Sequence, residues 1–557
     1  MTENEKHPLN YEALASAFRA EGTDVMFSLL GDGNMHWGGS MVDQGARGLY
    51  FRHEHPACAA ATIYANATGK VGVATVTCGP GLSQLSTALA TAAQGRVPLV
   101  VFAGESPYNL AFYNQYIDQG PMVTATGAHY IAGHSHVRML DYVRDAFFIA
   151  RTERRPVVLG VPYDLQKQSH GRAFKYVTST EFIPRLARMT PNADEIDAAA
   201  EVIGNAKRVV VIGGRGTMPA NAQLECEALA DAVGGMLATS LPMRGMFDHH
   251  PFGIGIAGGY ARAAGRKFLS EADVIVAVGA SLNNFQRDGG KLFEQATIIQ
   301  IDIHPQGLKH GRKAADMYVR ADAKQALSAI IAKLPEKRTN SSWRTPEAQA
   351  EIASLVVDQT QFPAQENVVD PREAVIAIDA VVPKHWQIVN SSGHCAYYTA
   401  QLRGRKPENF NVLRDFGAIG NGLSYAIGVA SAHPEDTVCL LDGDGSLMMH
   451  AQELDTVRRH GLNILMCILN DGAYGSEIHK MRADGINDEG GVFGRGDLAS
   501  VARGFGLRGR TINSIDQFEI AFREYQTSGG GAELWDIHIA DNVTSPVMRH
   551  NQISKAH

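Results

Sequence analysis

The chain has 557 residues, of which 45% are hydrophobic and 20% are charged, a composition typical of a large globular protein. Its 57 glycines are about 10% of the residues, against a usual ~7%, and they follow no collagen-like period, so a fibrous or a disordered chain is excluded. With 51 basic and 58 acidic residues the net charge is −7, which gives no support to a nucleic-acid-binding surface.

The cysteines indicate a reducing compartment, and the hydropathy pattern shows neither a signal peptide nor a membrane segment. Six cysteines are scattered along the chain with no C-x-x-C pair, which favours buried free thiols over a zinc site or a disulfide framework. The first residues, MTENEKHPLN, lack the apolar core of a signal peptide. Apolar runs such as Val274–Val278 are too short to span a bilayer. We therefore expect a cytoplasmic protein with no membrane segment.

Short apolar runs that end near glycine or proline and precede a helix-like stretch recur along the whole chain. Such runs are typical of parallel strands that helices cover on both faces. The predicted strands are Val71–Thr77, Pro98–Ala103, Pro156–Val161, Arg208–Ile212, Asp273–Val278, Thr297–Ile303, Thr437–Leu441 and Asn463–Leu469. The alternation predicts an α/β fold of three consecutive domains with parallel sheets.

Two stretches break this alternation and divide the chain. Residues 168–195 and 335–372 are polar and richer in proline or in serine and threonine, as linkers are. They place a first domain at residues 1–170, a middle domain at 190–335 and a third domain at 371–545, followed by a C-terminal arm at 546–557. The length agrees with this division, since a typical domain has roughly 150 residues.

The most informative motif lies in the third domain, between Val438 and Tyr474. A predicted strand ends in Gly443-Asp444-Gly445-Ser446, a helix follows, and the next strand ends in Asn470-Asp471-Gly472. A strand–helix–strand crossover brings Asp444 and Asp471 side by side at the carboxyl ends of neighbouring strands, where α/β sheets bind ligands. Two carboxylates and a backbone carbonyl suit Mg²⁺, while the glycines allow phosphates to approach a helix N-terminus.

This pair of motifs resembles the thiamin-diphosphate signature of the superfamily of pyruvate decarboxylase and acetohydroxyacid (acetolactate) synthase. The resemblance implies thiamin diphosphate and Mg²⁺ as cofactors, with Asp444, Asp471 and the backbone of Ala473 as metal ligands. The other residues that it places at the cofactor here are Gly443, Gly445, Ser446 and Tyr474. The sequence departs from the family at Asp471, where an asparagine is usual; the aspartate keeps the oxygen ligand and adds a negative charge.

The first domain carries a second part of the resemblance. The segment from Phe51 to Lys70, FRHEHPACAAATIYANATGK, is similar to the family segment whose glutamate hydrogen-bonds N1′ of the aminopyrimidine. By this resemblance Glu54 is the catalytic acid that favours the imino tautomer of the cofactor. Cys78-Gly79-Pro80-Gly81 follows a strand and matches the family loop beside the aminopyrimidine, so Gly79, Pro80 and Gly81 are predicted cofactor contacts.

In the third domain, the stretch from Phe416 to Leu423 resembles the family segment that supports the bent cofactor. The resemblance places Ile419 as the side chain that holds the cofactor in its V shape, and the carbonyl of Gly417 as the acceptor for N4′. An ordinary core isoleucine is the alternative interpretation of Ile419.

The substrate side gives mixed signals. Asp32 lies where pyruvate decarboxylases have an acidic residue, and Glu477 lies where they have a catalytic glutamate. The segment from Phe112 to Gln119 instead looks like the corresponding region of the synthases, which makes Gln115 the side chain over the reacting carbon. We predict Asp32, Gln115 and Glu477 as catalytic residues beside Glu54, with surface acids and a loop glutamine as the alternatives.

The middle domain has glycine-rich turns after its strands, at Gly213-Gly214-Arg215-Gly216 and around Gly279, and an acid at a strand end, Asp302. These positions parallel loops that hold FAD in the synthases and ADP in oxalyl-CoA decarboxylase. Gly213, Gly214, Gly216 and Asp302 are therefore candidate nucleotide contacts, although Ser281 stands where the synthases have an arginine. FAD or ADP remains open at this point.

The resemblance covers essentially the whole chain. It implies a homodimer or homotetramer, because the cofactor of this family lies between the first domain of one chain and the third of another. The predicted reaction is decarboxylation of a small 2-oxo acid, followed by carboligation or aldehyde release. The alternatives are cleavage or hydrolysis of a C–C bond in a 2-hydroxyacyl-CoA or a diketone, and a catalytically silent paralogue; a plain NAD-dependent dehydrogenase is more distant.

Overall fold

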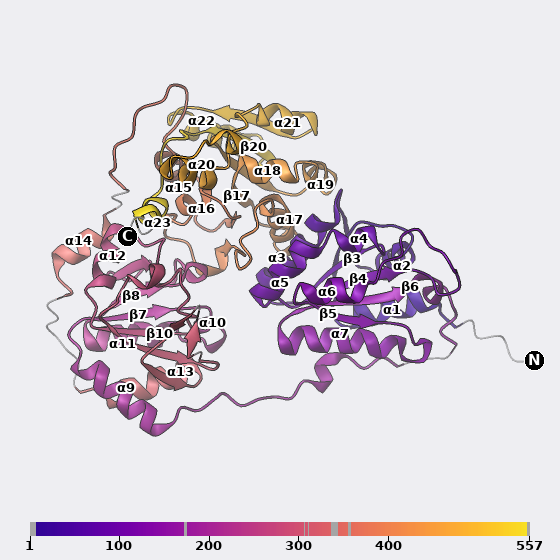
Figure 1. Ribbon diagram of the computed structural model, residues 1–557, viewed down its shortest axis with the longest axis horizontal. Helices are drawn as coiled ribbons and strands as arrows, with labels where there is room; N and C mark the ends of the chain where they lie inside the picture. The colour runs from indigo at the N-terminus through magenta and orange to yellow at the C-terminus, as the bar shows by residue number, and fades with distance from the viewer. Residues whose placement is uncertain are drawn as a thin grey trace, which may run out of the picture.

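The computed structural model describes residues 7–171, 175–305, 307–309, 311–335, 343–354 and 358–553. Within these residues the chain forms three six-stranded sheets of parallel strands, one in each third of the sequence, and each sheet is flanked by helices (Figure 1). The prediction of three consecutive parallel α/β domains is confirmed. Among the described residues, no helix is both long and apolar enough to cross a membrane.

The first sheet has the strand order β2-β1-β3-β4-β6-β5. Its strands are β1 (Val25–Ser28), β2 (Arg47–Tyr50), β3 (Gly72–Val76), β4 (Leu99–Glu105), β5 (His129–Ala132) and β6 (Pro156–Pro162). The helices are α1 (Asn10–Ala20), α2 (Met35–Asp43), α3 (Glu54–Thr68), α4 (Pro80–Ser83), α5 (Ser86–Gly95), α6 (Gln119–Ala125), α7 (Met139–Glu153) and α8 (Tyr163–Gln166), with 3₁₀ turns η1 (His136–Arg138) and η2 (Ser179–Phe182). The order reverses between β1 and β3, so the strand ends there open a crevice.

The middle sheet has the order β14-β11-β10-β7-β8-β9. Its strands are β7 (Val209–Gly213), β8 (Met236–Thr239), β9 (Gly253–Ile256), β10 (Val274–Val278), β11 (Thr297–Asp302) and β14 (Met317–Arg320), and β12 (Leu308–Lys309) and β13 (Arg312–Lys313) form a separate hairpin. The helices are α9 (Ala193–Asn205), α10 (Thr217–Ala220), α11 (Gln223–Val233), α12 (Ala263–Ser270), α13 (Ala323–Lys333) and α14 (Pro346–Ala353), with 3₁₀ turns η3 (Leu241–Met243) and η4 (Asp288–Gly290).

The third sheet has the order β16-β15-β17-β18-β20-β19. Its strands are β15 (Gln387–Asn390), β16 (Phe410–Asn411), β17 (Val438–Gly443), β18 (Ile464–Asn470), β19 (Arg508–Ile512) and β20 (Glu533–His538). The helices are α15 (Pro371–Val381), α16 (Cys395–Thr399), α17 (Gly422–Ala432), α18 (Asp444–Met449), α19 (Glu453–Arg459), α20 (Gly475–Ala483), α21 (Leu498–Gly504), α22 (Gln517–Thr527) and α23 (Pro546–Ile553), with 3₁₀ turns η5 (Pro407–Asn409) and η6 (Glu489–Gly491).

Local chemistry explains where these elements form. Strands β10 and β18 are buried at every position, as expected for central parallel strands with helices on both faces. The side chain of Asn192 accepts hydrogen bonds from the first amides of α9, and that of Asp370 does the same for α15. Such caps satisfy backbone donors that a helix leaves unpaired at its N-terminus.

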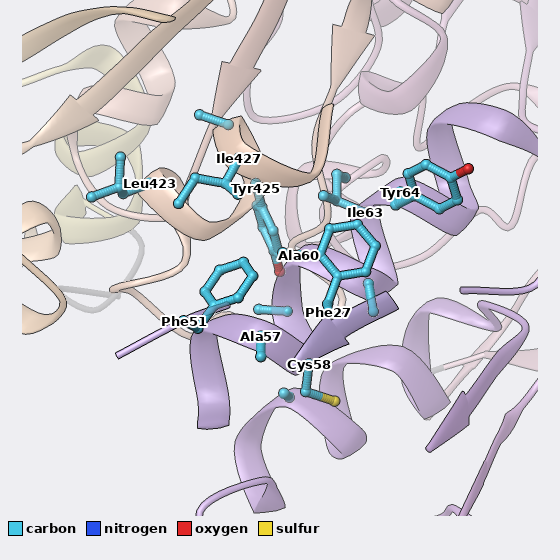
Figure 2. Close-up of a cluster of buried hydrophobic side chains, with 14 of the residues drawn as sticks. Phe27, Phe51, Ala57, Cys58, Ala60, Ile63, Tyr64, Leu423, Tyr425 and Ile427 are labelled. Carbon is cyan, nitrogen blue, oxygen red and sulfur yellow. The ribbon is translucent and has the colours of Figure 1, made fainter. Parts of the chain in front are cut away.

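The first and third domains pack against each other through α3 and α17 (Figure 1). Both helices are rich in alanine and glycine, so their backbones approach closely: a Cβ on Gly428 of α17 would overlap the carbonyl oxygen of Ala60 in α3. Side chains of the two helices meet with strand β1 in one apolar cluster that includes Phe27, Ile63 and Tyr425 (Figure 2). The core of the first domain therefore continues into that of the third.

The end of the chain returns to the middle domain. Helix α23 lies close to α20, and Val547 packs against the core of the third domain. Arg549 pairs with Asp358 at 2.8 Å, and a Cβ on Gly259 of the middle domain would come 3.2 Å from Val547. The segment predicted as a C-terminal arm thus begins with a helix that contacts both domains.

Candidate active site

Asp444 and Asp471, the two predicted metal ligands, lie at the carboxyl ends of the neighbouring strands β17 and β18. These strands pair in parallel, from Val438 beside Ile464 to Gly443 beside Leu469. The amide of Gly472 donates to Oδ2 of Asp444 at 2.9 Å, and the amide of Ala473 donates to Oδ1 of Asp471 at 3.2 Å. The two carboxyl groups lie close enough for each to affect the pKa of the other. The crossover therefore places both predicted ligands together, as the spacing indicated.

Burial raises the pKa of both carboxyl groups above the usual range of an aspartate, and the proximity of Asp471 raises the pKa of Asp444 further. None of the described cationic side chains forms an ion pair with either group. Two adjacent buried carboxylates repel each other unless a cation lies between them. The described residues hold no group of three or more histidine, cysteine or acidic side chains that would form a denser metal site.

Ser446 and Gly445 shape the loop around this pair. The hydroxyl of Ser446 donates to Oδ2 of buried Asp442 at 2.7 Å and accepts from the amide of Gly420 at 2.9 Å. A Cβ on Gly445 would lie 2.8 Å from the ring of Tyr474, so a larger residue here would require that ring to move. Ser446 thus ties the start of α18 to the loop that precedes α17.

The predicted loop Gly79-Pro80-Gly81 starts α4 beside Gln115. A Cβ on Gly79, whose φ is +55°, would overlap the carbonyl oxygen of Gln115, and the thiol of Cys78 lies 3.4 Å from the Gln115 side-chain oxygen. The amide of Gly79 donates to Oε1 of Gln119 at 3.0 Å. The sequence singled out Gln115, but buried Gln119 is the residue that fixes this loop.

Glu54 is the first residue of α3, and its Oε1 lies 3.6 Å from the position of a Cβ on Gly81. The predicted acid and the predicted loop are therefore neighbours. Asp32 is exposed. Burial raises the pKa of Tyr113 to about 12, and the nearby charges of Cys78 and Asp32 contribute to this increase. The structure thus gathers Glu54, Asp32, Gln115 and the glycine loop in the first domain.

Three further predicted residues lie in the third domain. Gly417 has a φ of +75°, which favours glycine, and its backbone is exposed. Ile419 is half-buried and is not a residue of the apolar core, so the core alternative is not supported. Glu477 lies in the first turn of α20, three residues after Tyr474, and pairs with Lys480 at 3.3 Å on the surface.

The candidate nucleotide loop of the middle domain has a structural reason for its glycines. A Cβ on Gly214 would overlap the carbonyl oxygen of Gly279, and one on Gly216 would lie 2.7 Å from the Gly279 Cα. Asp302 accepts from the amide of His304 at 2.8 Å. Close packing of two loops therefore accounts for Gly214 and Gly216, and a bound nucleotide at Gly213, Gly214, Gly216 and Asp302 stays a prediction.

Sequence reasoning missed several polar residues near the site. Buried His394 lies beside Asp471, since a Cβ on Gly475 would come within 3.3 Å of both side chains, and its Nε2 accepts from the amide of Ser545 at 3.1 Å. Buried Asn470 donates to Asp536 at 2.7 Å and so anchors the end of β18. Asn470 stood within the recognised motif, whereas nothing in the sequence separates His394 from an ordinary core histidine.

Comparison with known proteins identifies three family domains along the chain. Three family descriptions match consecutive parts of the chain: "Thiamine pyrophosphate enzyme, N-terminal TPP binding domain" over residues 11–122, "central domain" over 196–330 and "C-terminal TPP binding domain" over 391–534. The "Acetolactate synthase isozyme 2 large subunit" of Escherichia coli is 28% identical over 92% of both chains.

Two more relatives match over a similar length. The "Probable acetolactate synthase large subunit" of Methanococcus aeolicus is 26% identical over 92% of this chain and 89% of its own. The "Acetolactate synthase large subunit" of Buchnera aphidicola is 26% identical over 93% of this chain and 94% of its own. With its three matched domains and its paired motifs, the chain belongs to the thiamine pyrophosphate enzymes, within the superfamily of acetohydroxyacid synthase and pyruvate decarboxylase.

Proposed function

We propose that this enzyme decarboxylates a small 2-oxo acid and then joins the product to a second carbonyl compound or releases it as an aldehyde. The observation that carries the proposal is the relation to acetolactate synthases over 92% of the chain, at 26–28% identity. Two neighbour relations support it: Glu54 lies beside Gly81 in the first domain, and Asp444 lies beside Asp471 in the third.

We infer that Mg²⁺ binds at Asp444 and Asp471. The supporting observation is the pair of buried carboxyl groups in contact without a cationic partner among the described residues. Hard oxygen ligands suit Mg²⁺, and phosphate oxygens of the cofactor would supply further ligands. The residues present therefore fit the metal, with the carbonyl of Ala473 as the proposed third ligand.

Thiamin diphosphate, when bound, supplies a carbon nucleophile and an electron sink for decarboxylation. The proposed task of Glu54 is to hold a proton at the pyrimidine nitrogen. Gly445 and Ser446, at the start of α18, would hold the diphosphate, because backbone amides at a helix N-terminus bind anions. Gln115 and Asp32 are the first-domain side chains that we place near the reacting carbon, and Phe112 would help to exclude water once a second chain covers it.

A second copy of this chain completes the proposed site. Phe112 is 81% exposed and Tyr116 is 72% exposed, both on the segment that carries Gln115, and Tyr474 and Phe493 are exposed beside the metal motif. Apolar surface of this kind marks an interface rather than a solvated loop. We propose a homodimer or a homotetramer. Because the names of the relatives call them large subunits, a smaller partner chain is a second possibility to test.

Two observations bear on the step after decarboxylation and on the compartment. Asp32 lies close enough to Tyr113 to raise the pKa of that phenol, and we propose that its carboxyl group would transfer the proton that aldehyde release requires. All six cysteines are free and buried, which supports a reducing, cytoplasmic location.

The deciding experiment is a product analysis. The protein is supplied with thiamin diphosphate and Mg²⁺ and offered pyruvate and other 2-oxo acids, 2-hydroxyacyl-CoAs and cyclic diketones, with products identified by mass. We expect CO₂ and either a 2-hydroxy-3-oxo acid or an aldehyde from at least one 2-oxo acid. Turnover of a CoA ester or a diketone alone would replace the proposal, and failure to exchange the cofactor C2 proton would indicate a silent paralogue.

A further inference from the structure

Arg244, in the loop between β8 and β9, is buried without a hydrogen-bonding partner. Its exposed fraction is 3%, and Nε, Nη1 and Nη2 all lack an acceptor among the described residues. No other described arginine leaves all three nitrogens buried and unpaired. The ring of Phe410 lies 4.0 Å from its guanidinium carbon and offers only a cation–π contact. Such a contact is weaker than the hydrogen bonds that a buried guanidinium requires.

Two neighbouring arginines raise the free-energy cost of burying the unpaired charge of Arg244. Arg405 pairs with Asp379 and donates to the carbonyl of Val382 at 3.0 Å. Arg414 donates to Asn390 and to the hydroxyl of Tyr260. Burial lowers the pKa of Arg244 well below its usual range, and the neighbouring charges of Arg414 and Arg405 lower that pKa further. The cluster therefore carries more positive charge than its own residues balance.

Arg244 lines a cavity of about 310 Å³ between the middle domain and the third domain. Its walls come from the loop before β9, from β9 itself, from the start of α12, from the end of α14 and from residues 400–403 after α16. None of Gly213, Gly214, Gly216 and Asp302 contributes to it. This cavity lies along an edge strand, so it is separate from the strand-end loops where a nucleotide is predicted.

Two more arginines line the same cavity. Arg262 donates from Nε to the side-chain oxygen of Gln401 at 3.2 Å and from Nη2 to its backbone carbonyl at 2.9 Å. Arg403 donates from Nη1 to the backbone carbonyl of Ile352 at 3.3 Å. Each has a further guanidinium nitrogen without an acceptor among the described residues. Burial lowers the pKa of Arg262 to about 10, with Arg403 as the next cause.

The acidic residues of the cavity wall are already engaged. Asp248 accepts from the amide of Gly404 at 2.8 Å, and Glu351 pairs with Lys267 at 2.7 Å. The cavity wall thus carries three guanidinium groups and two carboxylates, and both carboxylates have other partners. The net charge of the wall is therefore positive. The cavity has open space beside Gly255, since nothing lies within 4 Å of the position of a Cβ on this residue.

We propose that this cavity binds the phosphate group of a small molecule through Arg244, Arg262 and Arg403. Guanidinium forks match phosphate oxygens and give bidentate hydrogen bonds. A volume of about 310 Å³ is at the lower end of small-molecule pockets, which suits inorganic phosphate or one phosphate ester rather than a whole dinucleotide. Ile254, Ile256 and Leu402 give the wall an apolar part that an organic group attached to the phosphate would contact.

The test measures ligand binding and needs no turnover. The full-length protein, saturated with thiamin diphosphate and Mg²⁺ so that inorganic phosphate does not occupy the predicted diphosphate site, is titrated calorimetrically with inorganic phosphate, AMP and succinate at constant ionic strength. Arg244→Met, Arg262→Gln and Arg403→Gln are compared with Arg523→Gln, which changes an exposed arginine of α22. We expect each cavity variant to weaken phosphate or AMP binding at least tenfold, and Arg523→Gln to leave it unchanged.

The probes separate the two sources of phosphate. AMP that binds at least tenfold more tightly than inorganic phosphate identifies a phosphate ester, and equal affinities identify free phosphate. Succinate that binds as tightly as either would overturn the assignment to phosphate. Wild-type protein that binds neither phosphate nor AMP, or variants at all three arginines that bind them undiminished, would overturn the site.

Melting temperatures add a readout specific to Arg244. In phosphate-free buffer, Arg244→Met should melt above wild type, because it removes an unpaired buried charge while keeping an apolar contact with Phe410. Added phosphate should raise the melting temperature of wild type but not of this variant. A variant that melts below wild type without phosphate and gains as much from phosphate would contradict the proposal. None of these binding and melting measurements requires turnover, so their outcome does not depend on whether the proposed reaction is correct.

Discussion

The imidazole Nε2 of His55 lies 2.7 Å from the side-chain oxygen of Asn421, and this hydrogen bond joins the first and third domains beside the predicted catalytic acid. His55 follows Glu54 in α3, and Asn421 immediately precedes α17. Burial lowers the pKa of His55, so the neutral ring donates to the amide oxygen. Both residues are buried, which makes the bond a fixed link between the two parts of the site.

Replacement of Asn421 by alanine should destabilise the protein. The variant leaves the buried donor of His55 unpaired, which costs about 1–3 kcal/mol. Asn421→Asp is the matched control, because it keeps an acceptor and should retain more stability at pH 6, where a carboxylate favours the protonated ring. Chemical denaturation measures both variants. Equal stability of wild type and Asn421→Ala would show that the bond contributes nothing.

Glu54→Gln should lose most of the activity with the fold intact. The amide keeps the size of the side chain but cannot hold the proton of a carboxylic acid, and general acid–base catalysis contributes about 10²–10⁴-fold. Rates with the 2-oxo acid identified by product analysis, circular dichroism and cofactor affinity are the measurements. Full activity in this variant would disprove the cofactor assignment of the first domain.

Asp471→Asn should stabilise the metal-free protein and weaken its binding of Mg²⁺. The substitution removes one of two buried carboxyl groups that repel each other, but it also removes charge from the proposed metal site. Melting in the presence of a chelator should rise by a few degrees, and a Mg²⁺ titration should show a higher dissociation constant. Asp471→Ala should bind metal and cofactor still more weakly; wild-type affinities in that variant would argue against coordination by Asp471.

Glu453 makes stability depend on pH. Its carboxyl accepts from the amide of Arg52 at 3.1 Å and from Thr456 at 2.6 Å, at the N-terminus of α3. Burial raises the pKa of Glu453 from 4.5 to about 7, although these hydrogen bonds and Arg459 act in the opposite direction. The folded protein thus holds this proton to a higher pH than the unfolded chain. The Glu453 contribution to the unfolding free energy falls between pH 4.5 and 7, by on the order of 3 kcal/mol, and stays low above pH 7.

Glu453→Gln should therefore be more stable than wild type at pH 8, and the difference should disappear near pH 4.5. Nearby His450 acts in the opposite direction, because burial lowers its pKa to about 4 and stability then rises between pH 4 and 6.5. The difference between variant and wild type, measured by thermal melting across this range, removes the His450 contribution. A variant that is less stable than wild type at pH 8 would refute the effect.

Gly214→Ala should disrupt the middle domain. Its Cβ would overlap the carbonyl oxygen of Gly279 and lie 2.5 Å from the Cα of Ala280, and both are backbone atoms that cannot move aside. Gly39→Ala is the matched control: Gly39 lies in α2 with nothing within 4 Å of its Cβ position, so alanine should stabilise by about 0.5–1 kcal/mol. Comparison of melting temperatures is the measurement, and a tolerated alanine at 214 would contradict the packing interpretation.

The parallel sheets could be predicted from sequence because each central strand is a continuous apolar run. Asp273–Val278 was predicted and β10 spans Val274–Val278; Asn463–Leu469 was predicted and β18 spans Ile464–Asn470. Edge strands such as β16, with two residues, have no such signal. The tail after residue 545 was predicted as an arm, and its helix was not recognised because its contacts with Asp358 and the middle domain are distant in sequence.

The candidate site divides in the same way. Asp444 and Asp471 could be paired from sequence because one crossover connects their strands, and the geometry is then set by the fold. The contacts of Glu453 with Arg52 and of His55 with Asn421 could not be predicted, because each joins residues of two different domains. An unpaired buried arginine in particular has no sequence signature, since its environment exists only after the domains meet.

The pairing of α3 with α17 has a consequence for how the protein is made. The hydrogen bond from His55 to Asn421 spans 366 residues, so α3 leaves the ribosome roughly 20 to 70 s before its partner at 5–20 residues per second. During that time the face of α3 that packs against α17 has no partner helix to cover it. The apolar cluster shared by the first and third domains can therefore be completed only after α17 has been synthesised, late in translation.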